Sequence, residues 1–348
     1  MRELRFIEPG TVRWEQAPDP LLEDPGSALV RPLAVARCDL DIAMAAFGIF
    51  PGPYPVGHEA VGEVVEVGDR VTSFARGDRV VVPFQVSCGS CRPCSGGRFA
   101  ACEPFKAKAG AAFGFGEAGG GHGGAVADLL AVPAAEHLLL HVPEAISDVV
   151  ACTLADNVID GYRAVAAGLA RYPGEEVLIV GGAAPSIGLY AVASAFALGA
   201  GGVRFADSDP ERCAAAEALG ATIEDVGEEW PRRFDRALVV VDNVLEPEGL
   251  HAALRSTDGY GFCTSVAIHF GETTPMPLLE MYTRGITYHT SRADSRRLLP
   301  EVIEMVAEGR LDPRRVPTTV AGWTEADEVW LEPAIKLVVE RGAAAGEA

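Results

Sequence analysis

Thiol, imidazole and carboxylate groups that could bind one metal ion occur at three separate places in this sequence. They are Cys38, the adjacent pair His58 and Glu59 within a Gly-His-Glu sequence, and the polar cluster Asp156-Asn157. A lone Gly-His-Glu is weak evidence, because adjacent His and Glu residues are more often a solvated turn than a ligand pair. The other groups give it weight, and we interpret the three places as scattered ligands of one metal ion.

Four further cysteines lie within fifteen residues of one another, and they are Cys88, Cys91, Cys94 and Cys102. Gly and Pro residues between them predict a loop. Four thiolates at these spacings can close tetrahedrally around Zn²⁺ and leave no open position, so this site would stabilise a lobe and do no chemistry. We expect no export signal, and metal binding is therefore favoured over disulfides.

A glycine-rich turn follows the apolar run 176–180 and precedes a helix predicted from about Ile187 to Leu198. A strand at Val203–Ala206 and the acid Asp207, 19 residues after Gly188, come next. Strand, turn, helix, strand and acid in this order predict a βαβ unit that binds a dinucleotide. The residues expected to contact the cofactor are Gly181, Gly182, Ala184, Pro185, Ser186, Ile187, Gly188, Asp207, Arg212 and Ser265.

This turn departs from the usual Gly-x-Gly-x-x-Gly pattern. Ala184 stands two residues after Gly182, and the loop is one residue longer than usual. Gly181 or Gly182 is expected to form the tight turn, and Gly188 allows helix and strand to pack closely. The amide groups at the start of the helix would then face the pyrophosphate.

The acid after the second strand predicts the nucleotide. A carboxylate at Asp207 accepts hydrogen bonds from ribose hydroxyls and repels a 2′-phosphate, so NAD is preferred over NADP. We interpret Arg212, five residues further on, as an exposed helix residue that caps the adenosine site.

Two parts of the chain must position these groups, since 348 residues exceed one typical domain. In the first part, short β-type runs broken by Gly and Pro predict a small antiparallel barrel. A helix over Asp41–Phe47 would leave Cys38 at its N-terminal edge, where the helix dipole lowers the pKa of a thiol. Ala125–Val132 is predicted as a strand, and His122, in the glycine run before it, as a solvent-facing side chain.

From about Ala151 the hydrophobic period changes. A helix over Val149–Ala170 is followed by alternating strands and helices, which predict an open parallel sheet. We expect a catalytic domain at 1–150 with a zinc lobe at 86–105, a cofactor domain at 151–287, and a return to the catalytic domain at 288–348.

The composition excludes several classes of protein. A net charge of −20 opposes binding to nucleic acid or to an anionic membrane. No apolar run reaches the roughly 18 to 20 residues of a membrane span, so we expect a soluble, cytoplasmic protein.

The cysteine run, the Gly-His-Glu sequence and the βαβ acid, in this order, resemble the zinc-containing medium-chain alcohol dehydrogenases over nearly the whole chain. The resemblance implies an α/β protein with a GroES-like antiparallel β-barrel domain and a Rossmann doubly wound parallel-sheet domain, assembled as a homodimer or homotetramer. It also implies two zinc ions per subunit. One is structural and held by the four cysteines, and the catalytic one is held by Cys38, His58 and a third residue, with Glu59 as a supporting group or occasional ligand.

The third ligand of the catalytic zinc has two candidates. Aligning the family's pattern on Gly161–Ala164 places it at Asp156, and the formaldehyde dehydrogenase branch is similar in having Asp there. Cys152, four residues earlier, would share a helix face with Asp156 and is the alternative.

The chain also departs from the family where alcohol-oxidising members carry a proton relay. Leu40 and Ala43 stand where hydroxyl and imidazole groups are usual, and neither can move a proton. Asp160 replaces a threonine near the nicotinamide, and Asp39 follows the cysteine ligand. Either carboxylate could have taken over the relay, or both could be surface groups.

The resemblance implies a zinc-dependent oxidoreductase that moves a hydride between NAD(H) and an alcohol or carbonyl substrate. The alternative among enzymes is reduction of an enal or enone at its carbon–carbon double bond, for which a lost relay is no handicap. A zinc- and nucleotide-binding protein without catalysis is the alternative outside enzymes.

Overall fold

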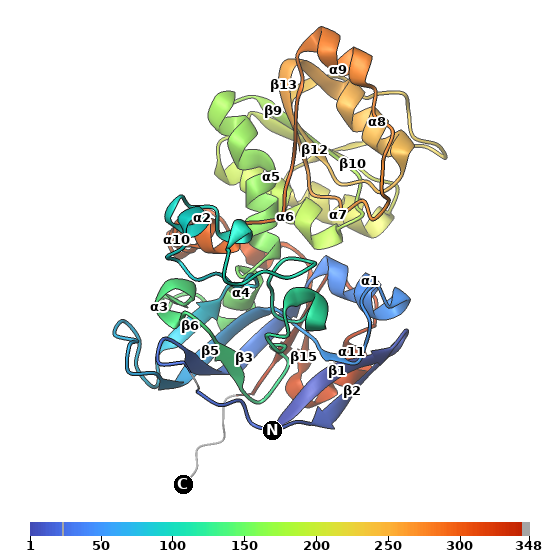
Figure 1. Cartoon of the computed structure of the whole chain (residues 1–348). Helices are drawn as coiled ribbons and strands as arrows, with labels where there is room; N and C mark the ends of the chain where they lie inside the picture. The colour runs from blue at the N-terminus through green and yellow to red at the C-terminus, as the bar shows by residue number, and fades with distance from the viewer. Residues whose placement is uncertain (23, 343–348) are drawn as a thin grey trace. The chain divides into compact units, whose positions relative to one another are not determined.

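The computed structural model describes residues 1–22 and 24–342, and they form two units (Figure 1). Unit 1 comprises residues 1–159, 294–308 and the segment from 318 onward, and unit 2 comprises residues 160–293 and 309–317. The first boundary therefore falls nine residues after the expected position, and the second falls six residues after it.

Unit 1 is built on antiparallel strands. Its larger sheet has the order β15-β16-β3-β5-β6-β8, with β7 also paired to β3, and its smaller sheet has the order β2-β1-β4. The strands are β1 (Arg2–Glu8), β2 (Thr11–Gln16), β3 (Ala28–Arg37), β4 (Tyr54–Pro55), β5 (Glu59–Val67), β6 (Arg79–Val82), β7 (Leu130–Val132), β8 (Leu140–His141), β15 (Thr318–Gly322) and β16 (Lys336–Glu340). The helices that begin in this unit are α1 (Asp39–Phe47), α2 (Arg92–Ser95), α3 (Ala135–Leu138), α4 (Asp148–Thr153), α5 (Asn157–Arg171), α10 (Ser295–Ala307) and α11 (Ala326–Val329).

The pairing of β3 with β5 positions the first group of polar side chains. Val30, Val35, Val61 and Val64 on these strands are fully buried and form the centre of the sheet. The register shifts next to Pro32, because proline has no N–H to donate to the ladder. Ala36 near the end of β3 lies opposite Glu59 at the start of β5. The residues just after β3 and just before β5 therefore come to the same end of the sheet.

Two elements of unit 1 differ from the expected ones. The helix predicted over Val149–Ala170 is interrupted, since α4 ends at Thr153 and α5 begins at Asn157. The N–H groups of Leu154 and Ala155 donate three residues back instead of four, which tightens the chain and interrupts the α-helical ladder. Of the strand predicted over Ala125–Val132, the last three residues form β7, and Ala127 makes an isolated bridge to Glu3.

Unit 2 contains a six-stranded parallel sheet flanked by helices, as Figure 1 shows. Its strands are β9 (Glu176–Val180), β10 (Gly202–Ala206), β11 (Thr222–Glu224), β12 (Ala237–Asp242), β13 (Thr257–Ser265) and β14 (Thr287–Thr290). Its further helices are α6 (Pro185–Ala197), α7 (Pro210–Leu219), α8 (Pro247–Ser256) and α9 (Leu278–Arg284). The strand order β11-β10-β9-β12-β13-β14 is that of the doubly wound dinucleotide-binding fold, in which ligands bind at the carboxyl ends of the strands where the order reverses. Here the reversal lies between β9 and β12.

Within residues 1–22 and 24–342, no helix combines the length and the apolarity that a membrane span needs.

Candidate metal centres and cofactor turn

The first candidate metal centre consists of four buried side chains of unit 1. Ligand atoms of Cys38, His58, Glu59 and Asp156 all lie within 4.8 Å of one another. Cys38 follows β3, His58 precedes β5, and Asp156 lies in the break between α4 and α5. The structure thus brings together the predicted residues from three distant segments. A thiol, an imidazole and a carboxylate are the donors that zinc takes in catalytic sites, so the set fits this metal.

A carboxylate lies near each ring nitrogen of His58. Nε2 is 3.3 Å from Asp156 Oδ2, and Nδ1 is 3.3 Å from Asp41 Oδ1. Burial lowers the pKa of His58, but attraction to Asp41 and hydrogen bonds to both carboxylates outweigh it and raise the pKa to about 10. An imidazole that ligates a metal is neutral, so metal binding at Nε2 would release this proton.

Asp41 was not anticipated from the sequence. Its Oδ2 accepts a hydrogen bond from the Cys38 N–H at 3.1 Å while Oδ1 lies near His58, so one buried carboxylate orients two members of the centre. A carboxylate beside the second ring nitrogen favours one ring orientation of a metal-binding histidine. The available signal was an acid three residues after Cys38, which forms a capping box at the start of α1.

Glu59 is held by a lysine from the far end of the chain. Lys336 Nζ lies 2.7 Å from Oε1 and 2.9 Å from Oε2 of Glu59, and it also donates to the Arg37 carbonyl at 2.9 Å. Both side chains are fully buried. Burial raises the pKa of Glu59, and the Lys336 charge opposes that rise. This contact engages both carboxylate oxygens of Glu59, which favours a supporting role over a primary ligand role.

Cys152, the alternative third ligand, is not among the residues of this centre. Its Sγ donates to the Val149 carbonyl at 3.3 Å, within its own helix. The expectation that Cys152 and Asp156 share a helix face fails because the helix is interrupted between them. The geometry therefore favours Asp156.

The expected lowering of the Cys38 pKa by the helix dipole is wrong. Burial raises the pKa of this thiol well above its usual value, and the carboxylates Asp156, Glu59 and Asp41 add to the rise. The N–H of Leu40 reaches Cys38 Sγ at 3.5 Å, which is too weak a contact to compensate. A cation in the centre is what would favour the thiolate.

The second candidate metal centre consists of the four clustered cysteines. Ligand atoms of Cys88, Cys91, Cys94 and Cys102 also lie within 4.8 Å of one another, and all four thiols are free. Backbone N–H groups donate to three of the sulfurs at 3.3 to 3.5 Å. Burial raises the pKa of Cys88, but hydrogen bonds from the backbone of Ser90 and Cys91 and from the Ser90 hydroxyl outweigh it and lower the pKa to about 6. Four convergent thiols fit a closed zinc site.

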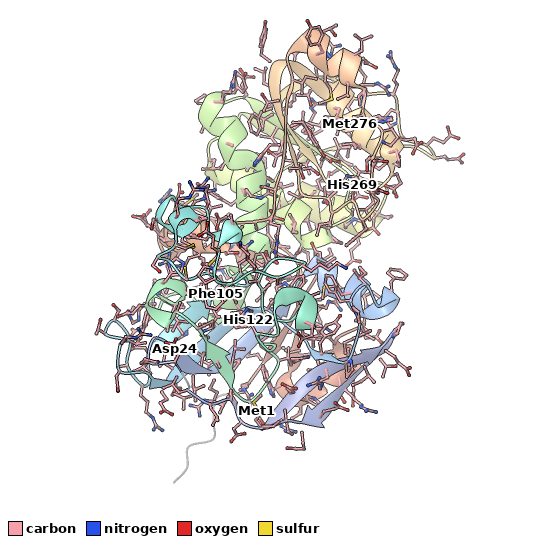
Figure 2. The ribbon with its side chains drawn as sticks, in the orientation of Figure 1. Met1, Asp24, Phe105, His122, His269 and Met276 are labelled. Atoms are coloured by element: carbon pink, nitrogen blue, oxygen red, sulfur yellow. The ribbon has the colours of Figure 1, made fainter. Side chains whose placement is uncertain are left out.

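His122 is not solvent-facing as predicted. Figure 2 labels it beside Phe105, and the two rings meet edge-on with centroids 5.6 Å apart. Phe113 lies on the same ring at 6.3 Å, and burial lowers the pKa of His122. The imidazole is thus a half-buried packing residue of the glycine-rich loop.

In unit 2, the predicted cofactor turn connects β9 to α6. Gly181 has a φ of +87°, which favours glycine, and α6 begins at Pro185. A Cβ at Gly182 would lie 2.1 Å from Asp207 Oδ2, so glycine is required there for the acid to approach the turn. Gly181 therefore forms the tight turn, and Gly182 allows the close contact with Asp207. The sequence pattern alone did not show which of the two glycines forms the turn.

Arg212 is not an exposed residue as expected. It pairs with both oxygens of Asp207, Nε to Oδ2 at 2.6 Å and Nη2 to Oδ1 at 2.7 Å. A cavity of about 480 Å³ opens beside this pair, and its lining includes the four acids Asp207, Glu224, Asp225 and Glu228. Among the described residues, none that lines this cavity is basic.

The remaining predicted site residues lie in different settings. Asp39 is the first residue of α1 and is half-buried. Asp160 is ion-paired with Arg163 at 2.6 Å. Ser265, at the carboxyl end of β13, is buried, and its carbonyl accepts from Arg163 Nη2 at 3.3 Å.

Comparison with known proteins agrees with this fold and with zinc binding. The family described as "Alcohol dehydrogenase GroES-like domain" matches residues 24–144. A probable zinc-binding alcohol dehydrogenase of Mycobacterium tuberculosis is 34% identical over 332 residues, which are 94% of this chain and 83% of that protein. A glutathione-independent formaldehyde dehydrogenase of Pseudomonas aeruginosa is 36% identical over 72% of this chain and 66% of its own.

Among solved structures, the alcohol dehydrogenase TADH from Thermus sp. ATN1 superposes with a TM-score of 0.89 at 28% identity, over 98% of this chain and 100% of that chain. The chain is an oxidoreductase with a GroES-like and a Rossmann-type unit. It belongs to the zinc-type alcohol dehydrogenase family. The predicted family and fold class are confirmed.

Proposed function

We propose that this protein transfers a hydride between NAD(H) and an alcohol or carbonyl compound with the help of a zinc ion. The buried group of Cys38, His58 and Asp156, supported by Asp41 and Glu59, carries the proposal. These three residues would hold a zinc ion, which would supply a Lewis acid for a substrate oxygen. The four cysteines would hold a second zinc, which gives two per subunit.

The protein's own residues would prepare the first centre for this reaction. Asp41 fixes the ring of His58 and, through the Cys38 N–H, the cysteine beside it. Lys336 holds Glu59 behind them. Phe84 and Phe115 lie against His58 with ring centroids at 5.7 and 5.1 Å, so apolar surface excludes water from this side of the centre.

A substrate panel tests the proposal. Purified protein with two bound zinc ions is assayed with NADH against aldehydes, including formaldehyde, and against ketones and enals, and with NAD against primary alcohols and sugar alcohols. We expect turnover with at least one carbonyl or alcohol class and its loss on zinc removal. Binding of NADH and zinc without turnover of any compound would favour the non-catalytic alternative.

We further infer that the protein is a cytoplasmic homo-oligomer, a dimer or tetramer. Unit 2 exposes four large apolar side chains on α9 and the neighbouring strand β13: Tyr260, Leu278, Leu279 and Tyr282 have exposed fractions of 72%, 66%, 76% and 84%. Apolar surface of this kind is typical of an interface.

NADH should bind more tightly than NADPH by at least about tenfold, or 1.4 kcal/mol. The acids around the cavity beside Asp207 would repel a 2′-phosphate, while Asp207 already engages Arg212 and Glu224 already engages Arg204. Titrations of both nucleotides measure the difference. Asp207→Ala should narrow this difference in affinity, whereas Glu211→Gln, which removes an exposed carboxylate from the following helix α7, should not. Equal affinity of the wild-type protein for both nucleotides would contradict NAD preference.

Oxidation of simple primary alcohols should be slow, and Leu40→Thr should accelerate it by about 10- to 100-fold. A positioned acid–base group contributes about 100- to 10,000-fold to such a step, and Leu40 lies at the relay position without one. Initial rates with ethanol and benzyl alcohol measure the effect, with zinc content expected to remain unchanged.

Leu40→Val is the matched control, because valine has the shape of threonine without its hydroxyl. Equal rates for Leu40→Thr and Leu40→Val would show that the threonine hydroxyl is not the cause of any acceleration. If Asp39→Asn also slowed the wild-type reaction, the relay would run through Asp39. If it did not, fast reduction of an enal or enone would favour the conjugate-reduction alternative.

A further inference from the structure

One asparagine of unit 2 makes four hydrogen bonds, three to the turn between β9 and α6 and one to the last residue of β9. Asn243 directly follows β12, its N–H donates to the Val180 carbonyl at 2.9 Å, and its carbonyl accepts from the Ala183 N–H at 3.0 Å. Its side chain pairs with a single residue: the Ala184 N–H donates to Oδ1 at 2.9 Å, and Nδ2 donates to the Ala184 carbonyl at 3.0 Å. Since Ala184 offers one donor and one acceptor, only an amide in this orientation satisfies both.

Two glycines of the turn also face this residue. A Cβ on Gly181 would lie 2.6 Å from the Asn243 carbonyl oxygen, and a Cβ on Gly188 would lie 2.9 Å from Nδ2. Contacts this short do not occur, so both positions require glycine for Asn243 to fit. The two glycines and the amide therefore form one packing unit.

The turn needs such support because of its own sequence. It is longer than the usual glycine pattern, and Ala184, the residue that caps α6, has no polar side chain and makes no side-chain capping hydrogen bond. The first turn of a helix binds a pyrophosphate only if the preceding loop directs its N–H groups at the ligand. Asn243 supplies from a neighbouring strand the hydrogen bonds that this loop cannot supply from its own side chains.

We propose that Asn243 is a positioning residue for the cofactor and holds the Gly181–Gly188 turn in the shape that receives the dinucleotide pyrophosphate. This inference rests on the proposed use of NAD(H). It predicts a role in affinity for the nucleotide rather than in the chemical step, because Asn243 is fully buried and contacts the turn itself.

The test uses the zinc-loaded enzyme and Asn243→Asp, which keeps the side-chain shape but replaces the Nδ2 donor with an oxygen facing the Ala184 carbonyl. We expect the Kd for NADH and for ADP-ribose to rise at least about tenfold, as for loss of a buried polar contact. Affinity for adenosine, which has no phosphate, should change less than threefold, about the resolution of such a comparison. KM for the nucleotide should rise while kcat and zinc content remain unchanged.

Asp242→Asn is the matched control. Asp242 is equally buried and precedes Asn243, but its carboxylate faces the Val244 N–H and Tyr288 rather than the turn. The Asp242→Asn variant should bind NADH as tightly as the wild-type protein does. Equal loss of affinity in both variants would show a general effect of disturbing the end of β12 and would overturn the proposal.

A second variant keeps the proposal testable if Asn243→Asp does not fold. Gly188→Ala favours the helix but forces the Asn243 amide to shift. It should therefore also weaken the binding of NADH and ADP-ribose and leave the binding of adenosine unchanged. Unchanged NADH affinity in a folded Asn243→Asp or, failing that, in Gly188→Ala overturns the role of Asn243. A wild-type protein that binds neither NADH nor NADPH would instead refute the proposed function.

Discussion

Cys38→Ser is expected to reduce the zinc content from two ions per chain to one and to lower kcat/KM by about 1000-fold or more. Serine is not deprotonated at neutral pH, so it cannot replace the thiolate beside His58 and Asp156. A Lewis acid contributes several kcal/mol of transition-state stabilisation, and each 1.36 kcal/mol is a tenfold change in rate. Elemental analysis and steady-state kinetics measure the two effects.

Two further variants make this result specific. Cys152→Ser removes another fully buried thiol of unit 1 that is not in the centre, and it should retain both zinc ions and activity. Asp156→Asn should behave like Cys38→Ser, because a neutral amide is a poor zinc ligand. If Cys152→Ser lost the metal while Asp156→Asn kept it, Cys152 would be the third ligand and our assignment would be wrong.

Lys336→Met should destabilise unit 1 by about 3–5 kcal/mol, the usual cost of removing one partner of a buried ion pair. The variant leaves the fully buried Glu59 carboxylate without the cation that contacts both of its oxygens. Urea denaturation followed by tryptophan fluorescence suits this measurement, since Trp14, Trp323 and Trp330 lie in unit 1 and Trp230 alone lies in unit 2.

The double variant Lys336→Met/Glu59→Gln is the control for this prediction. It removes both charges, so it should recover most of the stability lost in the single variant. The single variant Glu59→Gln completes the comparison. If the double variant lost as much stability as Lys336→Met and Glu59→Gln lose together, the pair would contribute no specific interaction and Lys336 would act through packing alone. Lys336→Arg, which keeps the charge but not the compact ammonium, should fall between the wild type and Lys336→Met.

The members of both metal centres were predictable because their side-chain types are unusual and their spacing is characteristic. The groups that support them were not. Lys336 contacts Glu59 across 277 residues of sequence. It lies in an apolar strand whose sequence contains no sign of this contact. Asn243 likewise acts on a turn about 60 residues earlier, and no local pattern links the two. Partners of this kind are determined by strand order, which the sequence pattern does not specify.

The interruption between α4 and α5 was missed for a different reason. Within residues 149–170, no Gly or Pro precedes Asp156 to mark a break. The break arises from hydrogen bonds to residues three positions back, and the N–H of Phe84 also donates to the Ala155 carbonyl at 3.4 Å. Tertiary contact thus overrode local propensity at the position where a metal ligand was needed.

The position of Lys336 on β16 also has a consequence for synthesis on the ribosome. β16 pairs with β3 and carries the cation that contacts Glu59, so the core of unit 1 is incomplete until residues 336–340 have been translated. Residues 160–293 of unit 2 are all made earlier, and domains generally fold as units during synthesis. A nascent chain stalled before residue 336 should therefore resist protease in unit 2 and remain susceptible in unit 1, and the first metal centre should form only after β16 has been translated.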